Sequence, residues 1–409
     1  MSEFKTFIKQ NNLSKNRHQK HGVKWILKRE TGEGIQGGLI CDEMGLGKTI
    51  QILGAMYSNP LKRTLIVLPN ALLEQWCTTI KQLLKVEPLI FHGPVVKNLT
   101  KKLVNAHTIT VTTYGMVAQN KSILRKIKWS RAVFDEAHHM RNTRTKAHKR
   151  ACELKRKITW LMTGTPIQNK RADFYALCKV LGLSEDYYLK DENMSEIASS
   201  FILKRTLKEV GIQLPELHEH TKLVKWKSER ERDFAKGLHS LLGFSGVSGT
   251  INSRSIVEQF NQCPLSTLLR ARQMCIYPEM VQKKIEEMVD DGIVPEENID
   301  ISSNSKIKAV VKKITKNRNG KSKLVFCHFR SEIDVLAKKL RKKNFSVATF
   351  DGRCSATERG FIMQSTPDVL ILQVQTCCEG LNLQQFKEVY FVSPHWNPAV
   401  EDQAVARAH

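Results

Sequence analysis

Short apolar runs recur along the chain, and a polar or glycine-containing turn follows each of them. Segments with apolar residues at helical spacing lie between many of these runs. Alternation of strands and helices indicates parallel sheets that are covered by helices on both faces. The runs predict strands at Gly38–Cys41, Thr64–Leu68, Thr108–Val111, Arg131–Phe134, Ile158–Met162, Lys323–Cys327, Val347–Phe350, Val369–Val374 and Val389–Val392.

The predicted strands fall into two groups, one ending near Met162 and the other starting near Lys323. The stretch between them has helical character and few strand signals. Within it, Gly243–Ser255 is rich in glycine and serine and predicts a mobile loop. Glu286–Ser305 is acidic and polar and predicts a linker. We therefore expect two α/β lobes joined by a helical section.

The charge balance points to a polyanionic partner. Of 409 residues, 65 are lysine or arginine and 40 are aspartate or glutamate, which gives a formal net charge of +25. Nucleic acid is the first candidate, because each phosphate that a cation neutralises releases counterions. A basic surface that serves only solubility is the alternative.

The spacing of the cysteines and the lengths of the apolar runs predict where in the cell the protein is found. None of the 10 cysteines forms a Cys-x-x-Cys pair, and most lie in apolar runs, which predicts buried, reduced thiols and no zinc site. Met1–Gln10 lacks a secretory apolar stretch, and the longest apolar runs have only the length of a strand. We expect an intracellular protein that does not enter a membrane.

A glycine-rich loop, Asp-Glu-Met-Gly-Leu-Gly-Lys-Thr at 42–49, follows the first predicted strand and precedes a helical pattern. Strand, loop and helix in this order are the context that a phosphate-binding loop requires. Gly45 and Gly47 would let backbone amides point at phosphate oxygens, aided by the helix N-terminus. Lys48 would bridge the β- and γ-phosphates, and the Thr49 hydroxyl would bind Mg²⁺.

An acidic pair stands at the end of a later strand, in Phe-Asp-Glu-Ala-His at 134–138. Asp135 would hold Mg²⁺, and Glu136 would orient and deprotonate an attacking water. Alone, this pair is equally consistent with a solvated acidic turn. Together with the upstream loop it indicates a nucleoside triphosphatase site.

These two segments resemble the Swi/Snf family of superfamily-two helicase-like ATPases, and the resemblance runs from about Asn16 to the last residue. The loop begins with Asp42 where the generic pattern has glycine, and that spelling is the family's own. The resemblance implies two RecA-like lobes that use ATP and Mg²⁺. It divides the chain into an ATP-binding lobe at 1–206, a helical protrusion with a linker at 207–305, and an incomplete C-terminal lobe at 306–409.

Further segments resemble the family's remaining motifs. His18-Gln19, with Trp25, resembles the adenine-side motif in which Gln19 reads the base, although an ordinary amphipathic helix would look similar. Leu65–Pro69 with Gln75-Trp76, and Thr112-Thr113-Tyr114, resemble loops that contact one DNA strand. Leu161–Asn169 resembles a motif that couples nucleotide state to lobe position. The resemblance implies coupling roles for Thr163, Thr165 and Gln168, and DNA contacts for Thr112, Thr113, Gly380 and Asn382.

Two basic blocks, Phe201–Arg205 and Leu268–Cys275, also resemble family blocks. The second would face DNA or the other lobe, and a core helix with a charged face is the alternative. Arg407 matches the first arginine of the sixth motif and would sense the γ-phosphate. The family has a second arginine shortly afterwards, but this chain stops at His409, and we expect that it is truncated.

The resemblance implies a motor that follows double-stranded DNA through its backbone, with little sequence preference. Nucleosomes or other DNA-bound proteins would be its further partners, and it would act as a monomer, in the nucleus if the cell is eukaryotic. Two alternatives remain open at this stage. One is a strand-separating DNA or RNA helicase, and the other is a DNA-binding scaffold that uses the nucleotide as a switch.

Overall fold

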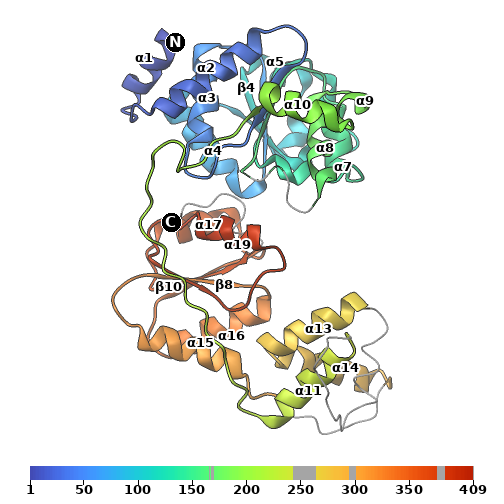
Figure 1. Cartoon of the computed structure of the whole chain (residues 1–409), viewed down its shortest axis with the longest axis vertical. Coiled ribbons are helices and arrows are strands. Elements are labelled where there is room, and N and C mark those ends of the chain that lie inside the picture. The colour runs from blue at the N-terminus through green and yellow to red at the C-terminus, as the bar shows by residue number, and fades with distance from the viewer. Residues whose placement is uncertain (165, 167–169, 243–263, 294–300, 375–382, 409) are drawn as a thin grey trace. The chain divides into compact units, whose positions relative to one another are not determined.

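The computed structural model describes residues 1–164, 166, 170–242, 264–293, 301–374 and 383–408. The described chain divides into two compact units (Figure 1). Residues 1–215 form unit 1, and unit 2 begins at Glu216.

Unit 1 is built on a seven-stranded sheet with the order β3-β4-β2-β5-β6-β1-β7. Every pairing in it is parallel. Strand β2 is buried at all of its residues, as expected for an apolar run with both faces covered. The strands are β1 (Gln36–Ile40), β2 (Thr64–Leu68), β3 (Leu89–Phe91), β4 (Ile109–Thr113), β5 (Trp129–Phe134), β6 (Arg156–Met162) and β7 (Ile202–Leu203).

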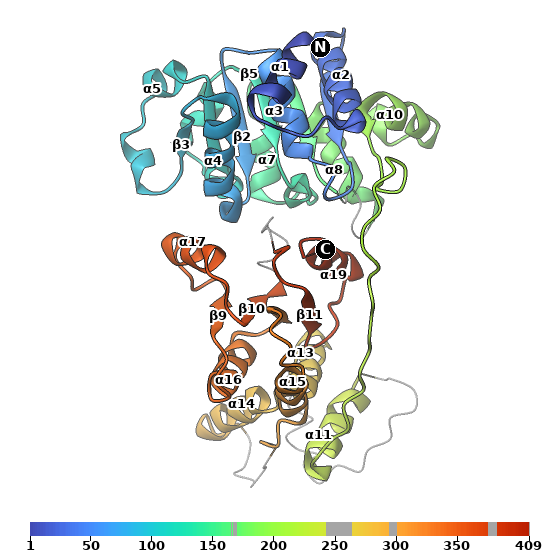
Figure 2. The ribbon, with the colours of Figure 1, turned by 90° about the vertical axis from the view of Figure 1, so that its left-hand side faces the viewer.

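Helices cover both faces of this sheet, and alternate residues of the strands join separate apolar cores (Figure 2). Leu65 and Val67 of β2 belong to one core, whereas Ile66 and Leu68 belong to the other. The second core receives α1 (Ser2–Gln10), α2 (Arg17–Thr31), α3 (Lys48–Ser58) and α4 (Leu73–Leu84). The first receives α5 (Lys101–Ala106), α6 (Tyr114–Val117), α7 (Lys146–Cys152), α8 (Arg171–Leu181), α9 (Glu185–Tyr188) and α10 (Met194–Phe201).

A buried ion pair fixes α2 to the sheet. Arg131 Nε donates to Glu30 Oε1 at 2.6 Å, and both side chains are almost fully buried. The indole of Trp160 donates to the same carboxylate oxygen at 2.9 Å. Because each charge has a partner and further hydrogen bonds, the pair is tolerated in the core.

Residues 212–226 carry neither helix nor strand. The segment 207–305, predicted as a helical protrusion with a linker, therefore includes a stretch near its start that is not helical. Helices begin only at α11 (Glu229–Ser240), which shares an apolar core with α13 (Pro264–Ile276) and α14 (Glu279–Asp290).

The basic helix α13 contributes Ala271 and Met274 to that core and carries Arg270 and Arg272 outside it. This supports the interpretation of a core helix with a charged face. The predicted linker Glu286–Ser305 starts inside α14, so its first residues are helical. The predicted loop Gly243–Ser255 lies outside the described residues.

Unit 2 also contains a parallel sheet, with the order β11-β8-β10-β9. Its strands are β8 (Lys323–Cys327), β9 (Val347–Phe350), β10 (Val369–Gln373) and β11 (Glu388–Phe391). Helices α15 (Ser305–Lys316) and α16 (Arg330–Arg341) pack against it, and α17 (Ala356–Gln364) and α19 (Pro398–Val405) complete the unit.

The predicted fold class is confirmed, and each predicted strand is present within two residues of its expected bounds. The cysteines in the described residues are free thiols, and four of them are buried: Cys41, Cys77, Cys178 and Cys327. In the described part of the chain, no helix is both long and apolar enough to cross a membrane.

Candidate nucleotide-binding site

The candidate residues gather at one edge of the sheet in unit 1. Parallel strands all point the same way, so their carboxyl ends and the loops that follow them share an edge, where ligands bind in open α/β sheets. Along the sheet order, Tyr114 follows β4, Asp135 follows β5, Thr163 follows β6 and Asp42 follows β1.

The loop between β1 and α3 has the backbone that a phosphate cradle needs. Gly45 and Gly47 have φ angles of +88° and +75°, in the left-handed region that side chains rarely adopt. A Cβ at Gly47 would lie 2.4 Å from Gln19 Nε2, the end of a side chain that can shift, so the positive φ angle is the main reason for glycine there. Lys48 is the first residue of α3, and its Nζ donates to the Asp42 carbonyl oxygen at 2.8 Å.

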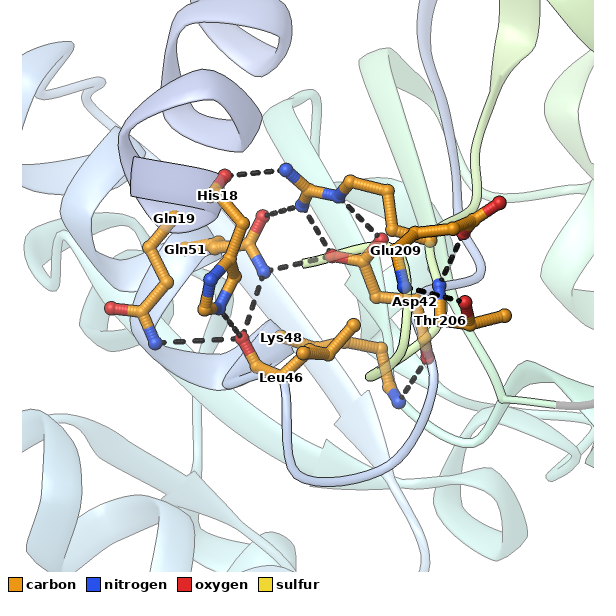
Figure 3. A network of polar contacts seen from close by, with 9 residues as sticks. His18, Gln19, Asp42, Leu46, Lys48, Gln51, Thr206 and Glu209 are labelled. Carbon is orange, nitrogen blue, oxygen red and sulfur yellow. Dashed lines mark hydrogen bonds and ion pairs between the residues drawn. The ribbon is translucent and has the colours of Figure 1, made fainter. Parts of the chain in front are cut away.

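Asp42 is the centre of a buried polar network beneath this loop (Figure 3). Its carboxylate accepts from Arg205 Nε at 3.0 Å and from Gln51 Nε2 at 2.9 Å, and its side chain is fully buried. Arg205 also donates to Gln51 Oε1 at 2.8 Å and to the backbone carbonyl of His18. The residue that departs from the generic loop therefore ties the loop to α2, α3 and the segment after β7.

The start of α2 also reaches the loop. His18 Nε2 lies 3.1 Å from the Leu46 carbonyl oxygen, and Gln19 Nε2 lies 3.4 Å from the same atom (Figure 3). Gln19 is buried against the loop, on an amphipathic helix. Its prediction as an adenine-reading residue stays a prediction.

Asp135 of the acidic pair accepts hydrogen bonds from Trp76, from Tyr114 and from the neighbouring Glu136. Trp76 Nε1 donates to Asp135 Oδ2 at 2.8 Å, and the Glu136 amide donates to Asp135 Oδ1 at 3.0 Å. The Tyr114 hydroxyl donates to the backbone carbonyl of Asp135 at 2.6 Å. Burial, and then the neighbouring charge of Glu136, raise the pKa of Asp135 to about 6.

His138 lies between Glu136 and Thr163 at the end of β6, and His139 stacks beside it. His138 Nδ1 lies 3.4 Å from Glu136 Oε2 and 3.4 Å from the Thr163 hydroxyl oxygen. The ring of His138 stacks on His139, and His139 stacks on Tyr114. Burial lowers the pKa of His139 to about 4, so this ring is neutral at pH 7.

These groups fit a triphosphate with a divalent cation. The positive charge of Lys48 partly offsets the rise in the pKa of Asp135. Gly164 lies beside the same lysine, since a Cβ built on it would be 3.8 Å from Lys48 Nζ. Glycine-lined space beside a lysine suits phosphate oxygens. A buried carboxylate whose pKa is raised gains from a nearby cation, and Mg²⁺ prefers such oxygen ligands. Thr49, the second residue of α3, is half-buried at the same helix end.

The predicted DNA-contact and coupling residues differ in where they lie. Thr112 is fully buried and its hydroxyl donates to the Phe91 carbonyl oxygen at 2.8 Å, so in this structure it is already used inside the sheet. Thr113 Oγ1 lies 3.3 Å from His92 Nδ1. Arg407 belongs to unit 2, where its carbonyl accepts from the Leu383 amide. Thr165, Gln168, Gly380 and Asn382 lie outside the described residues.

Sequence reasoning left several of these contacts unassigned. Arg205 was recognised only as part of a basic block, and Gln51 only as part of a helix. Trp76 and Tyr114 were recognised only within loops that resemble DNA contacts. Their partners lie 163, 9, 59 and 21 residues away along the chain, and spacing alone gives no signal for such pairings.

Comparison with protein families agrees with the site. Residues 18–191 match the SNF2-related domain, and residues 305–409 match the helicase conserved C-terminal domain. The chain belongs to the Swi/Snf family of helicase-like ATPases. The two matched domains together cover about two thirds of it.

Relatives of this Swi/Snf chain occur in viruses, bacteria and animals. The probable global transactivator of Orgyia pseudotsugata multicapsid polyhedrosis virus is 26% identical, over 96% of this chain and 82% of its own length. An uncharacterised ATP-dependent helicase of Mycoplasma genitalium is 27% identical, over 98% of this chain and 39% of its own. The human SWI/SNF-related matrix-associated actin-dependent regulator of chromatin subfamily A member 1 is 24% identical, over 96% of this chain and 40% of its own length.

This chain thus spans about two fifths of the length of the last two relatives. A solved structure, the Sulfolobus solfataricus SWI2/SNF2 ATPase core in complex with dsDNA, covers 96% of this chain and 84% of its own, with 23% identity and a TM-score of 0.45. At that score the likeness adds nothing to the family assignment.

Proposed function

We propose that this chain is the ATP-hydrolysing motor of a double-stranded-DNA translocase of Swi/Snf type. The observation that carries the proposal is the meeting of the Gly45–Lys48 loop and the Asp135–Glu136 pair at one edge of one sheet. A lysine, a hydroxyl at a helix start and two carboxylates are recurring parts of sites that transfer a phosphoryl group to water.

Each residue has a distinct part in this proposal. The amides of the loop and Lys48 bind the phosphates, and Thr49 and Asp135 hold Mg²⁺, which offsets the phosphate charge when it is bound. Glu136 orients the attacking water and accepts its proton. Gln19 binds the adenine.

Conversion of hydrolysis into movement requires that the two lobes respond to the nucleotide state. We propose that Arg407 senses the γ-phosphate and that Thr163, Thr165 and Gln168 pass the state on. Two states that grip DNA with different strength are sufficient for stepping.

The proposed track is the backbone of duplex DNA. A net charge of +25 favours a polyanion, and contacts to phosphates carry no sequence information. Thr113, Gly380 and Asn382 are the proposed backbone contacts. A regulator of chromatin among the relatives supports DNA-bound proteins such as nucleosomes as further partners, and a nuclear site in a eukaryotic cell. We also propose that the chain acts as a monomer.

The rate of ATP hydrolysis with different polymers tests this function. We expect stimulation by duplex DNA to exceed stimulation by single-stranded DNA or RNA, and Lys48→Ala to abolish the rate in every case. Lys126→Ala, at an exposed site outside the candidate site, is the matched control and should retain the rate. Stronger stimulation by single-stranded RNA would favour the strand-separating helicase, and hydrolysis unaffected by Lys48→Ala would exclude this site.

A salt titration of duplex binding tests the backbone grip. We expect affinity to fall at least ~10-fold between 50 and 200 mM salt and to change little with DNA sequence, because counterion release drives the binding. Binding that stays constant across this range would contradict a grip through phosphates.

A further inference from the structure

Asp135 is held from both faces of the sheet in unit 1. Trp76, on α4, belongs to the apolar core on one face and donates to the carboxylate. Tyr114, at the start of α6, belongs to the core on the other face and donates to the backbone carbonyl of the same residue. Both aromatic side chains are buried, with 3% and 7% of their surface exposed.

Each of these donors starts close to a loop that resembles a DNA contact. Trp76 is the fourth residue of α4, and the turn Asn70–Leu72 joins that helix to β2. Tyr114 directly follows Thr113, the last residue of β4. Strand β2 lies between β4 and β5 in the sheet, so the loop after β2 is next to the end of β5, which Asp135 follows, and the loop after β4 is one strand further away.

A second connection runs from Tyr114 to Glu136. The phenol ring stacks on His139 with centroids 5.2 Å apart, and His139 stacks on His138 at 4.9 Å. His138 Nδ1 lies 3.4 Å from Glu136 Oε2. Tyr114 therefore contacts one acidic residue through its hydroxyl and reaches the other through packed rings.

We propose that Trp76 and Tyr114 are positioning residues through which the DNA-contacting loops set the geometry of Asp135 and Glu136. This inference rests on the proposed function, since it assigns the structural route by which duplex DNA stimulates hydrolysis. When DNA fixes the two loops, both donors are fixed as well, and the acidic pair is held in one orientation. Packed side chains and hydrogen bonds carry coupling between neighbouring sites in this way.

The test uses two substitutions that each remove one donor and keep an aromatic ring at the position, although phenylalanine is smaller than the indole of Trp76. Trp76→Phe removes the indole N–H, and Tyr114→Phe removes a single oxygen atom. Trp129→Phe removes a buried indole N–H that donates to the Leu124 carbonyl at 2.9 Å, and it is the matched control for the first. Tyr188→Phe, at another buried phenol, is the control for the second.

The measurements are kcat with and without saturating duplex, the KM for ATP, the duplex Kd and the melting temperature. We expect the ratio of stimulated to unstimulated kcat to fall ~10-fold in Trp76→Phe and in Tyr114→Phe, because each loses a hydrogen bond to the acidic residue. The KM and the duplex Kd should stay within ~2-fold, and both control variants should keep the ratio of the wild type.

Three outcomes would overturn the inference: an unchanged ratio, an equal fall of kcat with and without DNA, or the same loss in the controls. If Trp76→Phe fails to fold, Tyr114→Phe still decides, since it alters only one oxygen. A wild type that duplex DNA does not stimulate would overturn the proposed function as well, and that failure is visible before any variant is made.

Discussion

The two units carry an aspartate at equivalent places, directly after a strand, and surround it differently. In unit 1, Asp135 follows β5, and burial raises its pKa to about 6. In unit 2, Asp351 follows β9 and accepts from the guanidinium of Arg353, which lowers its pKa. A nearby cation would lower the pKa of Asp135 towards its ordinary value, whereas the guanidinium of Arg353 already lowers the pKa of Asp351. The parallel-sheet architecture recurs in both units, but of these two aspartates only Asp135 would be stabilised by an added cation.

The same contrast holds within unit 1. Asp42 lies only a few residues before Lys48, yet its carboxylate is taken up by Arg205 and Gln51. Charges that are neutralised inside the fold support the site, and those that are not are available to a ligand. This distinction tells structural carboxylates from ligand-binding ones where sequence position alone does not.

The largest expected effect comes from a matched pair of substitutions in the two units. Asp135→Asn should lower kcat for ATP hydrolysis by more than ~10²-fold, because the cation ligand is lost. Asp351→Asn should leave kcat within ~5-fold. Steady-state assays at saturating Mg²⁺ and DNA measure kcat for both variants. An equal loss of kcat in the two would contradict the assignment of the cation site to Asp135 alone of these two aspartates.

Glu136→Gln is expected to separate chemistry from binding. The amide cannot accept a proton from water, so hydrolysis should fall by at least ~10²-fold, in line with the size of general-base effects. Nucleotide affinity should remain within ~3-fold, as followed by titration with a fluorescent ATP analogue. Turnover at the wild-type rate would favour a scaffold that uses nucleotide as a switch.

Removal of the two arginines compares two buried aspartates, one paired with a largely buried guanidinium and the other with a half-exposed guanidinium. Arg205→Met leaves the fully buried Asp42 charge without its guanidinium and should lower the free energy of unfolding of unit 1 by ~3–5 kcal/mol. Arg353 has 46% of its side chain exposed while Asp351 has 2%, so water can replace part of the lost contact and Arg353→Met should cost less, about 1–3 kcal/mol. Urea unfolding followed by circular dichroism measures both. A larger loss for Arg353→Met would contradict the assignment of Asp42 to a supporting network.

Glu332 is a buried carboxylate in unit 2 that could weaken the comparison. Burial raises its pKa to about 7 from an ordinary value of 4.5, while its Oε2 accepts from the amides of His328 and Phe329. Because the folded state binds this proton more tightly than the unfolded state, the contribution to stability is full below pH 4.5 and is lost as pH rises towards 7.

Glu332→Gln should therefore stabilise unit 2 at pH 8, by up to ~3 kcal/mol, and change little at pH 4.5. Melting temperatures at the two pH values, with Glu358→Gln on the exposed start of α17 as control, would show it. Because backbone amides hold the carboxylate, hydrolysis should be retained. If a stable Glu332→Gln protein lost ATP hydrolysis, Glu332 would take part in the reaction, which would contradict the assignment of the catalytic carboxylates to unit 1.

The smallest expected effect concerns two neighbouring threonines. Thr112→Val should leave duplex affinity within ~1.5-fold and cost about 1 kcal/mol of stability, since its buried hydroxyl bonds only within the fold. Thr113→Val should weaken duplex binding by ~2–5-fold, the size of one lost neutral hydrogen bond. Fluorescence anisotropy with labelled duplex resolves this difference, and a stronger effect at Thr112 would reverse the assignment.

Most of the fold was predictable from local patterns, because runs such as Thr64–Leu68 are apolar throughout and have the length of a strand. The strands that were missed are short. Leu89–Phe91 has three residues and Ile202–Leu203 has two, and pairing to a neighbouring strand, rather than their own pattern, defines them. The family was likewise predicted correctly from its motifs, since Lys48, Thr49 and the acidic pair occur at fixed places in the chain.

The support of the site was not predictable. Arg205 bonds to Asp42 across 163 residues, and Trp76 bonds to Asp135 across 59. Such contacts depend on which strands become neighbours, which no local spacing encodes. Thr112 was predicted to contact DNA, but its hydroxyl donates to the Phe91 carbonyl oxygen within the sheet. This contact exists because β3 pairs with β4, which the local sequence does not encode.

Calorimetric titration of a non-hydrolysable ATP analogue with Mg²⁺ measures directly whether this chain binds nucleotide at the Gly45–Lys48 loop. We expect one binding site per chain in the wild type and at least ~10-fold weaker binding in Lys48→Ala, since a charge-assisted contact to the phosphates is removed. Absence of binding in the wild type, or equal binding in both proteins, would contradict a nucleotide site at this loop.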